Sequence, residues 1–390
     1  MRIVKVHEYY TGAGGEDTVF HAERDLLREN GHEIIEYLEF NKKIESMHRA
    51  SVALQTVWSS SSYRKIKHFL ERTNPAIVHF HNIFPLISPS AYYACQELNI
   101  PVVQTLDNQR LICPAASFYR NGRLCTDCIG KTPPWPGIVH ACYHDSRLHT
   151  GVVSAMLTFH RWVRTWQIKV DAYLCSTAFY RDLFVESGLR AEKISVMPHF
   201  VQPDHQLSRE EREEYALFVG RLDPEKGVYT LLESWRRVDI TLKIRGEGRL
   251  EKDLRAYVKQ HKMDNVQFLG RLEEDELSNL IRNARFLVMP SEGYYETFGM
   301  VIIEAYARRT PVLASNIGVA PELVEDKVSG LLFEPGNPID LAEKAKWMWE
   351  HPKEISKMGE NGFLAYKDKY TPERCYDTLI SVYEAAIMSK

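Results

Sequence analysis

Short apolar runs alternate with segments of helical apolar spacing along nearly all of the chain. The runs at 2–7, 75–82 and 101–108 are only a few residues long and are bounded by turn residues or proline, which predicts buried strands. The segment 19–34 instead repeats apolar residues at helical spacing and has Gly31 as a stop signal. Strands that alternate with helices predict βαβ units, and therefore a parallel sheet.

This alternation occurs twice, which predicts two domains. The chain has 390 residues, more than one ordinary hydrophobic core accommodates. We place an N-terminal domain at 1–205 and a C-terminal domain at 206–371, with the charged segment 208–215 as a linker and an amphipathic terminal helix at 372–390. The expected fold class is α/β, with two Rossmann-like parallel-sheet domains that face each other across a cleft. Open α/β sheets bind their ligands in such places.

Composition narrows the classes of partner and compartment. A formal net charge of -3 gives no field that would attract nucleic acid. The printed sequence contains neither the long apolar run of a membrane-spanning helix nor the apolar stretch of a secretory leader. We therefore expect a cytoplasmic protein, whose seven cysteines are thiols or metal ligands rather than disulfides.

Two cations follow the first strand of the second set. Arg221 comes directly after the apolar run that ends in Gly220, and Lys226 comes five residues later, before Gly227 and a helix. Ligands of open sheets bind at this carboxyl edge. The fork of an arginine and the mobile ammonium of a lysine can together clamp a diphosphate. The alternative is an exposed loop with two solvated cations.

Two carboxylates flank a Phe-Gly step in the same domain, within "SEGYYETFGMVIIE" (291–304). Glu296 precedes the expected helix start at Phe298-Gly299, and Glu304 lies inside that helix. The first backbone N–H groups of a helix can bind an anion, and a carboxylate on each side can accept hydrogen bonds from the hydroxyls of a sugar or ribose. The alternative is that both acids are ordinary helix residues, with Glu296 favoured by the helix dipole.

A glycine-rich turn, "TGAGGEDT", follows the first strand of the chain. Its G-x-G-x-x-D pattern lacks the third glycine of a dinucleotide fingerprint, so it is a weak NAD site. Gly14 and Gly15 instead suit a backbone loop that approaches a phosphate or a sugar.

Together these segments resemble a known family. "GAGGEDTVFHAERDLLRENGHEI", "FVGRLDPEKG", "VQFLGRL", "ETFGMVIIEA" and "APELVEDKVSGLLFEPGN" occur in the order seen in retaining glycosyltransferases of family 4, and Glu296 and Glu304 match that family's E-x7-E motif. The resemblance covers nearly the whole chain. It implies the GT-B fold, in which the terminal helix, here 372–390, crosses back to the N-terminal domain. It also implies the transfer of a sugar from a nucleotide-diphosphate sugar, expected to be a UDP- or GDP-sugar, to a glycan, lipid-linked or small-molecule acceptor.

The resemblance also implies roles for the matching positions. Arg221 and Lys226 would bind the diphosphate and stabilise the leaving charge, Glu296 would contact sugar hydroxyls, and Glu304 would hold the ribose. Other donor contacts would come from the loop glycines and from two short segments: Gly14, Gly15, Gly270, Arg271, Leu272, Phe298, Gly299 and Met300. No cofactor is required for this chemistry, because fixed cations and a helix N-terminus can stabilise the leaving phosphate.

One position departs from the family pattern. After the strand at 101–106, family members commonly have a histidine that contacts the donor sugar, whereas this chain has Asp107. An ionised aspartate only accepts hydrogen bonds, so we expect an altered donor contact near C6 of the sugar. The alternative is that Asp107 caps a turn, a position that suits aspartate well.

A cysteine-rich insertion at 111–149 interrupts the alternation of the first domain. Its cysteines have the spacing C-x11-C-x2-C-x13-C, and four thiolates with one C-x-x-C pair suit a structural zinc ion. The alternative is a set of small buried thiols in a proline-rich loop. The predicted ligands are Cys113, Cys125, Cys128 and Cys142, with His140, His144 and His149 as substitutes.

His81 and Asn82 end a predicted strand at the cleft edge and are our candidates for contact with the acceptor. A packed histidine is the alternative. The stretch 158–170 mixes Arg161 and Arg164 with Trp162 and Trp166, a composition found in helices that lie on a membrane surface. A buried tryptophan stripe is the alternative there.

Other classes of function also fit two α/β domains. A nucleotide-sugar epimerase or phosphorylase could use the same scaffold, and a degenerate sugar-binding protein is the non-enzymatic alternative. The combination of the Arg221/Lys226 and Glu296/Glu304 pairs favours sugar transfer over all three.

Overall fold

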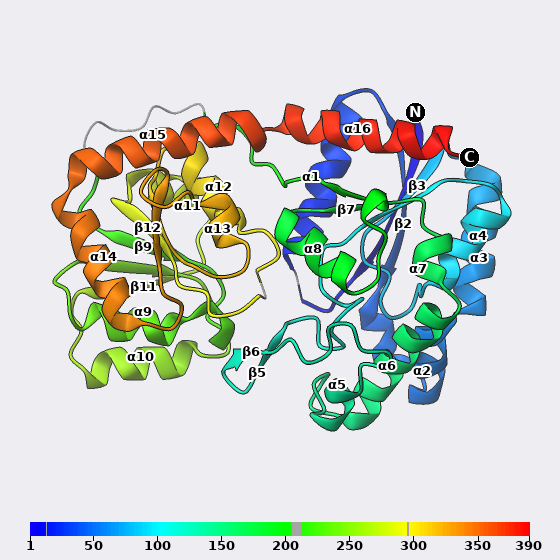
Figure 1. Ribbon diagram of the computed structural model, residues 1–390, viewed down its shortest axis with the longest axis horizontal. Helices are drawn as coiled ribbons and strands as arrows, with labels where there is room; N and C mark the ends of the chain where they lie inside the picture. Colours follow the sequence, from blue (N-terminus) through cyan, green and yellow to red (C-terminus); the bar gives the residue numbers. More distant parts are fainter. Residues whose placement is uncertain (13, 205–211, 295) are drawn as a thin grey trace. The chain divides into compact units, whose positions relative to one another are not determined.

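The structure is a computed structural model that describes residues 1–12, 14–204, 212–294 and 296–390 (Figure 1). The chain forms two compact units. Unit 1 comprises Met1–Phe118, Thr126–Pro198 and Cys375–Lys390, and unit 2 comprises Tyr119–Cys125 and His199–Arg374. The chain thus passes into unit 2 after Pro198, earlier than the predicted boundary at 205/206. That boundary and positions 208–211 of the predicted linker lie outside the described residues.

Unit 1 contains a six-stranded parallel sheet in the order β2-β1-β3-β4-β7-β8. The chain continues from β1 to β2 on one side and then to β3 on the other, so the β1/β3 boundary is the point where open sheets bind ligands. Residues on both faces of β1 are buried, as expected for a sheet covered by helices on both sides. The strands are β1 (Arg2–Tyr9), β2 (Glu33–Phe40), β3 (Ile77–Phe80), β4 (Val102–Thr105), β7 (Ala172–Cys175) and β8 (Ile194–Val196).

The helices of unit 1 connect these strands. They are α1 (Gly15–Glu29), η1 (Asn41–Ser46), α2 (Arg49–Val57), α3 (Ser60–Thr73), α4 (Ser90–Glu97), α5 (Trp135–Val139), α6 (Arg147–Trp162), α7 (Thr165–Ile168), α8 (Ala178–Glu186) and η2 (Ala191–Lys193).

Unit 2 contains a second six-stranded parallel sheet, in the order β11-β10-β9-β12-β13-β14. This is the strand order of dinucleotide-binding Rossmann sheets. The order reverses between β9 and β12, where such sheets bind their ligands, and we call this position the ligand point. The strands are β9 (Ala216–Val219), β10 (Leu242–Arg245), β11 (Val266–Gly270), β12 (Phe286–Met289), β13 (Val312–Ser315) and β14 (Gly330–Phe333).

Helices cover both faces of the second sheet, and each face has its own apolar core. One core contains side chains of α9 and α14, including the fully buried Trp235, and the other contains side chains of α12 and Tyr366 of α15. The helices are η3 (Pro224–Lys226), α9 (Val228–Trp235), α10 (Glu251–Gln260), α11 (Glu274–Asn283), α12 (Met300–Ala307), α13 (Ala320–Leu323), α14 (Pro338–Glu350) and α15 (Pro352–Lys369).

Two segments group with one unit although the residues next to them in sequence belong to the other. The antiparallel hairpin of β5 (Tyr119–Arg120) and β6 (Arg123–Leu124) groups with unit 2, although it lies within the cysteine-rich insertion. The terminal helix α16 (Pro372–Met388) groups with unit 1 from Cys375 onward. Among the described residues, no helix has both the length and the apolarity that crossing a membrane requires.

Candidate functional site

The predicted basic loop lies at the carboxyl end of β9, beside the ligand point of the second sheet. Arg221 follows this strand directly, and Lys226 ends the short helix η3. Gly227 then adopts a left-handed conformation with φ of 66° and starts α9. A Cβ at Gly227 would overlap the carbonyl oxygen of Pro290, so this turn requires glycine and fixes where Lys226 projects.

The predicted acidic loop follows β12, the strand that pairs with β9. Glu296 forms an ion pair with Lys226, and its other carboxylate oxygen accepts a hydrogen bond from the Gly299 N–H at 3.1 Å. Gly299, with φ of 94°, is the N-cap of α12. The structure therefore brings together the cation of one loop, the acid of the next and a helix N-terminus, as the sequence predicts.

Both members of this ion pair are partly buried, with exposed side-chain fractions of 17% for Lys226 and 21% for Glu296. Burial opposes the ionisation of Glu296. The positive charge of Lys226 and the hydrogen bond from Gly299 outweigh it, so the pKa of Glu296 lies below its usual value. At neutral pH the Glu296 carboxyl group is therefore ionised.

Arg221 is more exposed and has different partners. Its guanidinium lies 3.3 Å from the carboxylate of Asp223 and 3.7 Å from that of Glu225. Arg249 contacts the same two carboxylates at 3.3 and 3.2 Å. Sequence reasoning missed Arg249, because it lies far along the chain in a polar segment with no distinctive pattern. A second cation thus lies beside Arg221.

The remaining predicted donor residues of unit 2 lie on neighbouring elements. Glu304 lies within α12, and burial raises its pKa against the nearby charges of Arg308 and Arg245. Gly270 ends β11 in a left-handed conformation with φ of 67°. Arg271 and Leu272 follow it, and the Leu272 carbonyl accepts a hydrogen bond from Arg245 at 3.5 Å. Phe298, 1% exposed, packs in the core, and Met300 begins α12.

The predicted glycine loop of unit 1 lies at the carboxyl end of β1. Gly14 is the N-cap of α1, and its N–H donates to the carboxylate of Asp17 at 3.0 Å. A Cβ at Gly14 or Gly15 would meet no other atom within 4 Å. Packing therefore does not require glycine at either position, and both leave open space beside the backbone.

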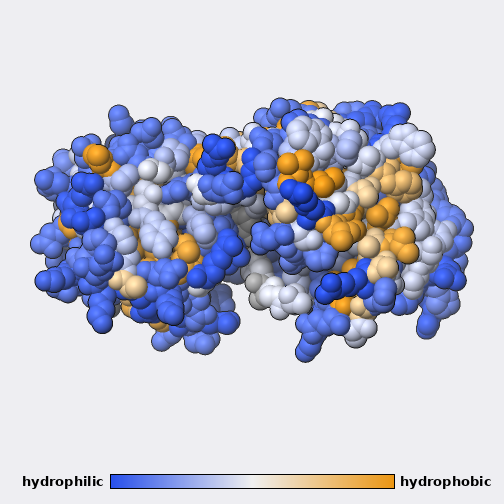
Figure 2. Space-filling model, turned by 90° about the horizontal axis from the view of Figure 1, so that it is seen from below, coloured by the Kyte–Doolittle hydropathy of each residue, from blue (hydrophilic) through white to orange (hydrophobic). Residues whose placement is uncertain are grey.

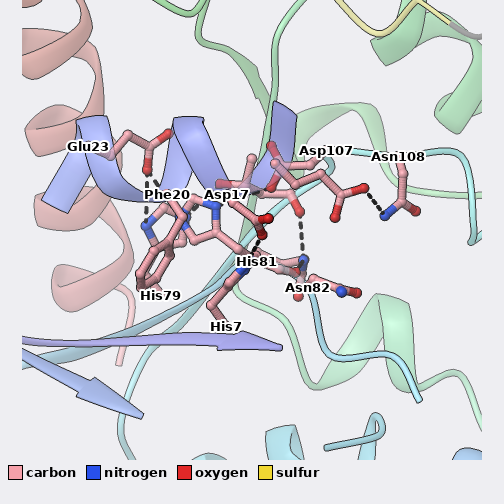
Figure 3. A network of polar contacts seen from close by, with 12 residues as sticks. His7, Asp17, Phe20, Glu23, His79, His81, Asn82, Asp107 and Asn108 are labelled. Carbon is pink, nitrogen blue, oxygen red and sulfur yellow. Dashed lines mark hydrogen bonds and ion pairs between the residues drawn. The ribbon is translucent and has the colours of Figure 1, made fainter. Parts of the chain in front are cut away.

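A buried network of charged groups lies beneath this loop (Figure 3). Lys5 of β1 forms an ion pair with Glu23 of α1 at 3.0 Å, and His81 lies 3.2 Å from the same carboxylate. The two ring nitrogens of His79 contact Tyr383 of α16 at 2.7 Å and Thr105 at 2.6 Å. Glu23, His79 and His81 place their ligating atoms as close together as a metal site would. The Lys5 ammonium already supplies the positive charge that Glu23 requires, so we assign the cluster a structural role.

His81 connects this network to Asp107. Its Nδ1 lies 3.1 Å from the Asp107 carboxylate, and Glu23 lies on its other side. Burial and Lys5 lower the pKa of His81, but the two carboxylates outweigh them and its pKa is raised. Burial lowers the pKa of His79 well below its usual value, so that ring is neutral.

Asp107 is not the residue that caps its turn. Asn108 does so, because its side-chain oxygen accepts a hydrogen bond from the Arg110 N–H at 2.9 Å. One Asp107 oxygen faces His81, and the other is buried without a hydrogen-bond partner among the described residues. Buried polar atoms normally have partners. One carboxylate oxygen of Asp107 is therefore still able to accept a hydrogen bond.

Glu16, at the start of α1, has the same property. One of its carboxylate oxygens accepts a hydrogen bond from Asn108 at 2.9 Å, and the other is buried without a partner among the described residues. Burial and the charge of Asp107 raise the pKa of Glu16 to about 7. Its carboxyl group therefore changes protonation near neutral pH.

The two residues predicted to contact the acceptor are buried and bonded within unit 1. His81 is 2% exposed, and Asn82 is 5% exposed. Asn82 donates to the Glu8 carbonyl at 2.7 Å and accepts hydrogen bonds from Tyr10 and from the Phe84 N–H. Both side chains thus have hydrogen-bond partners within unit 1 and require no ligand. Their predicted contact with the acceptor substrate stays a prediction.

The four predicted zinc ligands are divided between the two units. Cys128 is buried, and its sulfur lies 3.9 Å from the Pro134 carbonyl oxygen. Cys113, Cys128 and Cys142 belong to unit 1, but Cys125 belongs to unit 2. In the part of the chain that the structure describes, no group of three or more metal-ligating atoms includes a cysteine. The geometry lends the zinc prediction no support.

Sequence reasoning missed most of the buried network. Lys5 and His7 lie in an apolar strand, and Glu23 lies within a helical pattern that we used only to predict amphipathicity. The sequence did contain one signal for this network, namely charged residues between apolar positions. Charged side chains are seldom fully buried unless they are paired, so these positions indicated buried ion pairs.

Comparison with known proteins links this geometry to one class of enzyme. Residues 203–364, which lie within the His199–Arg374 segment of unit 2, match the family model described as "Glycosyl transferases group 1". An uncharacterized glycosyltransferase of Methanocaldococcus jannaschii is 36% identical over 170 residues, which are 44% of this chain and 48% of that protein. The O-antigen chain mannosyltransferase C of Escherichia coli is 29% identical over 197 residues, which are 49% and 53% of the two chains.

Over these residues the chain is similar in sequence to glycosyltransferases. The chain spans about half the length of these curated relatives. The family-model and sequence matches do not favour the epimerase and phosphorylase alternatives.

The solved structures show the fold over the full length. A glycosyltransferase from Rickettsia africae superposes with a TM-score of 0.73 at 16% identity, covering 100% of this chain and 99% of that one. The Anabaena protein HepE in complex with UDP gives a TM-score of 0.71 at 15% identity, covering 99% and 100%. Both likenesses confirm the predicted GT-B fold class with its two parallel α/β sheets.

Proposed function

We propose that this protein is a retaining glycosyltransferase that moves a sugar from a UDP- or GDP-sugar to a glycan, a lipid-linked molecule or a small molecule. The observation that carries the proposal is the Lys226–Glu296 pair beside the Gly299 N-terminus of α12. It lies at the ligand point of a parallel sheet, within the segment that matches a glycosyltransferase family model. The HepE structure with UDP makes a uridine nucleotide the first donor to test.

In this proposal the donor diphosphate takes the place of Glu296 as the partner of Lys226. Arg221 supplies a second cation, and the first N–H groups of α12 face the same anion. The oxygen of the acceptor hydroxyl bonds to the sugar carbon on the face from which the phosphate oxygen leaves. The electron pair of the broken bond stays on the diphosphate, which also takes the proton of that hydroxyl. Fixed positive charge at that point stabilises the leaving group more than it stabilises the bound donor, which lowers the barrier.

Glu296, released from Lys226, then accepts hydrogen bonds from sugar hydroxyls, and Glu304 holds the ribose. Gly270, Arg271 and Leu272 contact the base, and the backbone at Phe298 and Met300 contacts the sugar or phosphate. The donor contacts of Gly14 and Gly15 in unit 1 stay a prediction. The unpartnered oxygens of Asp107 and Glu16 accept hydrogen bonds from substrate hydroxyls.

The experiment that tests this proposal has two parts on one sample. Thermal unfolding is measured with UDP-, GDP-, ADP- and TDP-sugars, since a ligand that binds the native state raises its stability with the logarithm of its excess. The stabilising donors are then incubated with candidate glycan and lipid acceptors, and transfer is scored by mass spectrometry. Donor binding without transfer to any acceptor would indicate a sugar-binding protein instead.

Two further parts of the proposal concern metal and location. No cofactor takes part in the transfer, and a structural zinc ion at the insertion cysteines stays a separate proposal, which stoichiometric metal analysis of the purified chain tests. We also propose that the enzyme acts in the cytoplasm. A lipid-linked acceptor would bring it to the inner face of a membrane.

A further inference from the structure

Helix α6 carries an exposed apolar stripe that nothing in unit 1 covers. Leu148, Phe159 and Trp162 are 80%, 36% and 79% exposed. With Val152 and Ala155 they recur every three or four residues, and so they share one face of the helix. The opposite face packs in the core. Trp166, by contrast, is 3% exposed. Of the two tryptophans singled out from the sequence, only Trp162 is available to a partner.

Helix α5 extends this surface. Trp135 and Val139 at its two ends are 53% and 49% exposed. A groove of about 420 Å³ runs between α5 and α6, with Gly151 and Ala155 among its lining residues and Phe159 and Trp162 at one end. Figure 2 shows apolar side chains gathered on the face of unit 1 to which α5 and α6 belong. We call this surface the α5–α6 face.

The charges around the α5–α6 face are almost all positive. Residues 131–169 contain five Lys and Arg residues and a single acidic residue, Asp145. Lys131 lies over the Trp135 ring at 5.1 Å, and Arg161 donates to the Lys131 carbonyl at 2.6 Å. Within the described ranges, no ion pair with an acidic side chain involves Lys131, Arg147 or Arg164. The charges of these three residues are therefore available to an anionic partner, whereas the Arg161 guanidinium donates to the carbonyls of Lys131 and Leu111.

We propose that the α5–α6 face docks on an anionic lipid bilayer, with an acyl chain in the groove. Tryptophan and phenylalanine beside unpaired lysine and arginine suit the boundary between headgroups and acyl chains, where apolar burial and electrostatic attraction act together. The shared amphipathic character of the stripe, the groove and the basic rim fits a lipid surface better than a polar protein. The docking does not depend on sugar transfer, so the two proposals are tested separately.

The test is co-sedimentation of the full chain with vesicles of phosphatidylcholine, with and without phosphatidylglycerol. We expect binding to the anionic vesicles, weakened in high salt, and little binding to phosphatidylcholine alone. The double substitution Leu148→Ser and Trp162→Ser should reduce the partition coefficient about tenfold or more. The matched control, Ile339→Ser with Leu364→Ser, changes two exposed apolar residues of unit 2 that are 54% and 61% exposed, and it should bind as the wild type does.

Far-UV circular dichroism and donor-dependent thermal shifts, measured on the same variants, establish that each is folded and keeps its donor site. The proposal is overturned if the wild type stays in the supernatant with anionic vesicles, or if the control loses binding as much as the stripe variant. It is also overturned if Leu148→Ser with Trp162→Ser abolishes self-association in sedimentation velocity while vesicle binding is unchanged. In that case the face is a contact between copies of the chain.

Discussion

At the scale of single residues, the site is a set of charges that already have partners. Lys226 is neutralised by Glu296, and Arg221 lies beside Asp223 and Glu225. A diphosphate that enters must compete with these carboxylates. The same exchange frees Glu296 for the sugar, so one event would couple phosphate binding to sugar recognition. The sequence predicts that these residues lie near each other, but not that they are paired.

The substitution Glu296→Gln tests this exchange. Glutamine keeps an oxygen that can accept the Gly299 N–H but loses the charge that competes for Lys226. UDP without a sugar should therefore bind as well as to the wild type, or up to about tenfold more tightly. Transfer should fall by roughly 100-fold or more, because the sugar contact is weakened in the transition state. Calorimetry and initial rates measure the two effects. Weaker UDP binding with normal transfer would contradict the exchange.

Glu16 gives a prediction about pH. Its pKa is about 7 in the folded protein, above the ordinary glutamate value of 4.5, because burial and Asp107 disfavour its charge. The folded state therefore binds more protons than the unfolded state between these values, and its contribution to stability falls as pH rises from about 4.5 through 7. Glu16→Gln should remove this contribution and stabilise the protein at pH 8, relative to wild type, by roughly 1–3 kcal/mol.

Urea denaturation of both proteins at pH 5 and pH 8 measures this difference. At pH 5 the gap should shrink to about 1 kcal/mol or less, because the carboxyl group is then protonated in the folded state and ionised only in the unfolded state. A stability gap that is equal at both pH values would show that the Glu16 carboxyl group is not held neutral by its surroundings.

At the scale of elements, the loops after β9 and β12 depend on two glycines with positive φ. Gly227 begins α9 against the Pro290 carbonyl, and Gly299 begins α12. Apolar runs and helical spacing predict these elements well, because the central strands of both sheets are buried on both faces. The buried Lys5, Glu23 and His81 were not predictable in the same way. Their pairing depends on the register between β1, β3 and α1, which periodicity does not reveal.

Gly227→Ala should therefore destabilise unit 2 by about 3 kcal/mol or more, through left-handed strain and overlap with the Pro290 carbonyl. Gly14→Ala is the matched control. It starts a helix in the same way, but its φ is -129° and its Cβ would meet open space, so stability should change by less than about 0.5 kcal/mol. Thermal and urea unfolding compare the two variants. Equal losses would contradict the tight turn at Gly227.

At the scale of the whole molecule, the alternation of strands and helices predicts two parallel α/β units, and the solved structures agree. One membership was hidden from this pattern: the hairpin at Tyr119–Cys125 groups with unit 2. Such placements depend on contacts between distant segments, which local spacing does not encode. The central claim is that unit 2 holds the donor diphosphate through Lys226.

The most direct test is donor-dependent thermal stabilisation of Lys226→Ala, with Lys346→Ala as the control. Lys346 is an exposed lysine of α14 whose side chain is 67% exposed. We predict that the UDP- or GDP-sugar that stabilises the wild type stabilises Lys346→Ala equally, and that Lys226→Ala loses most of this stabilisation together with transfer. A Lys226→Ala variant that is stabilised by the donor and transfers sugar like the wild type would contradict the account.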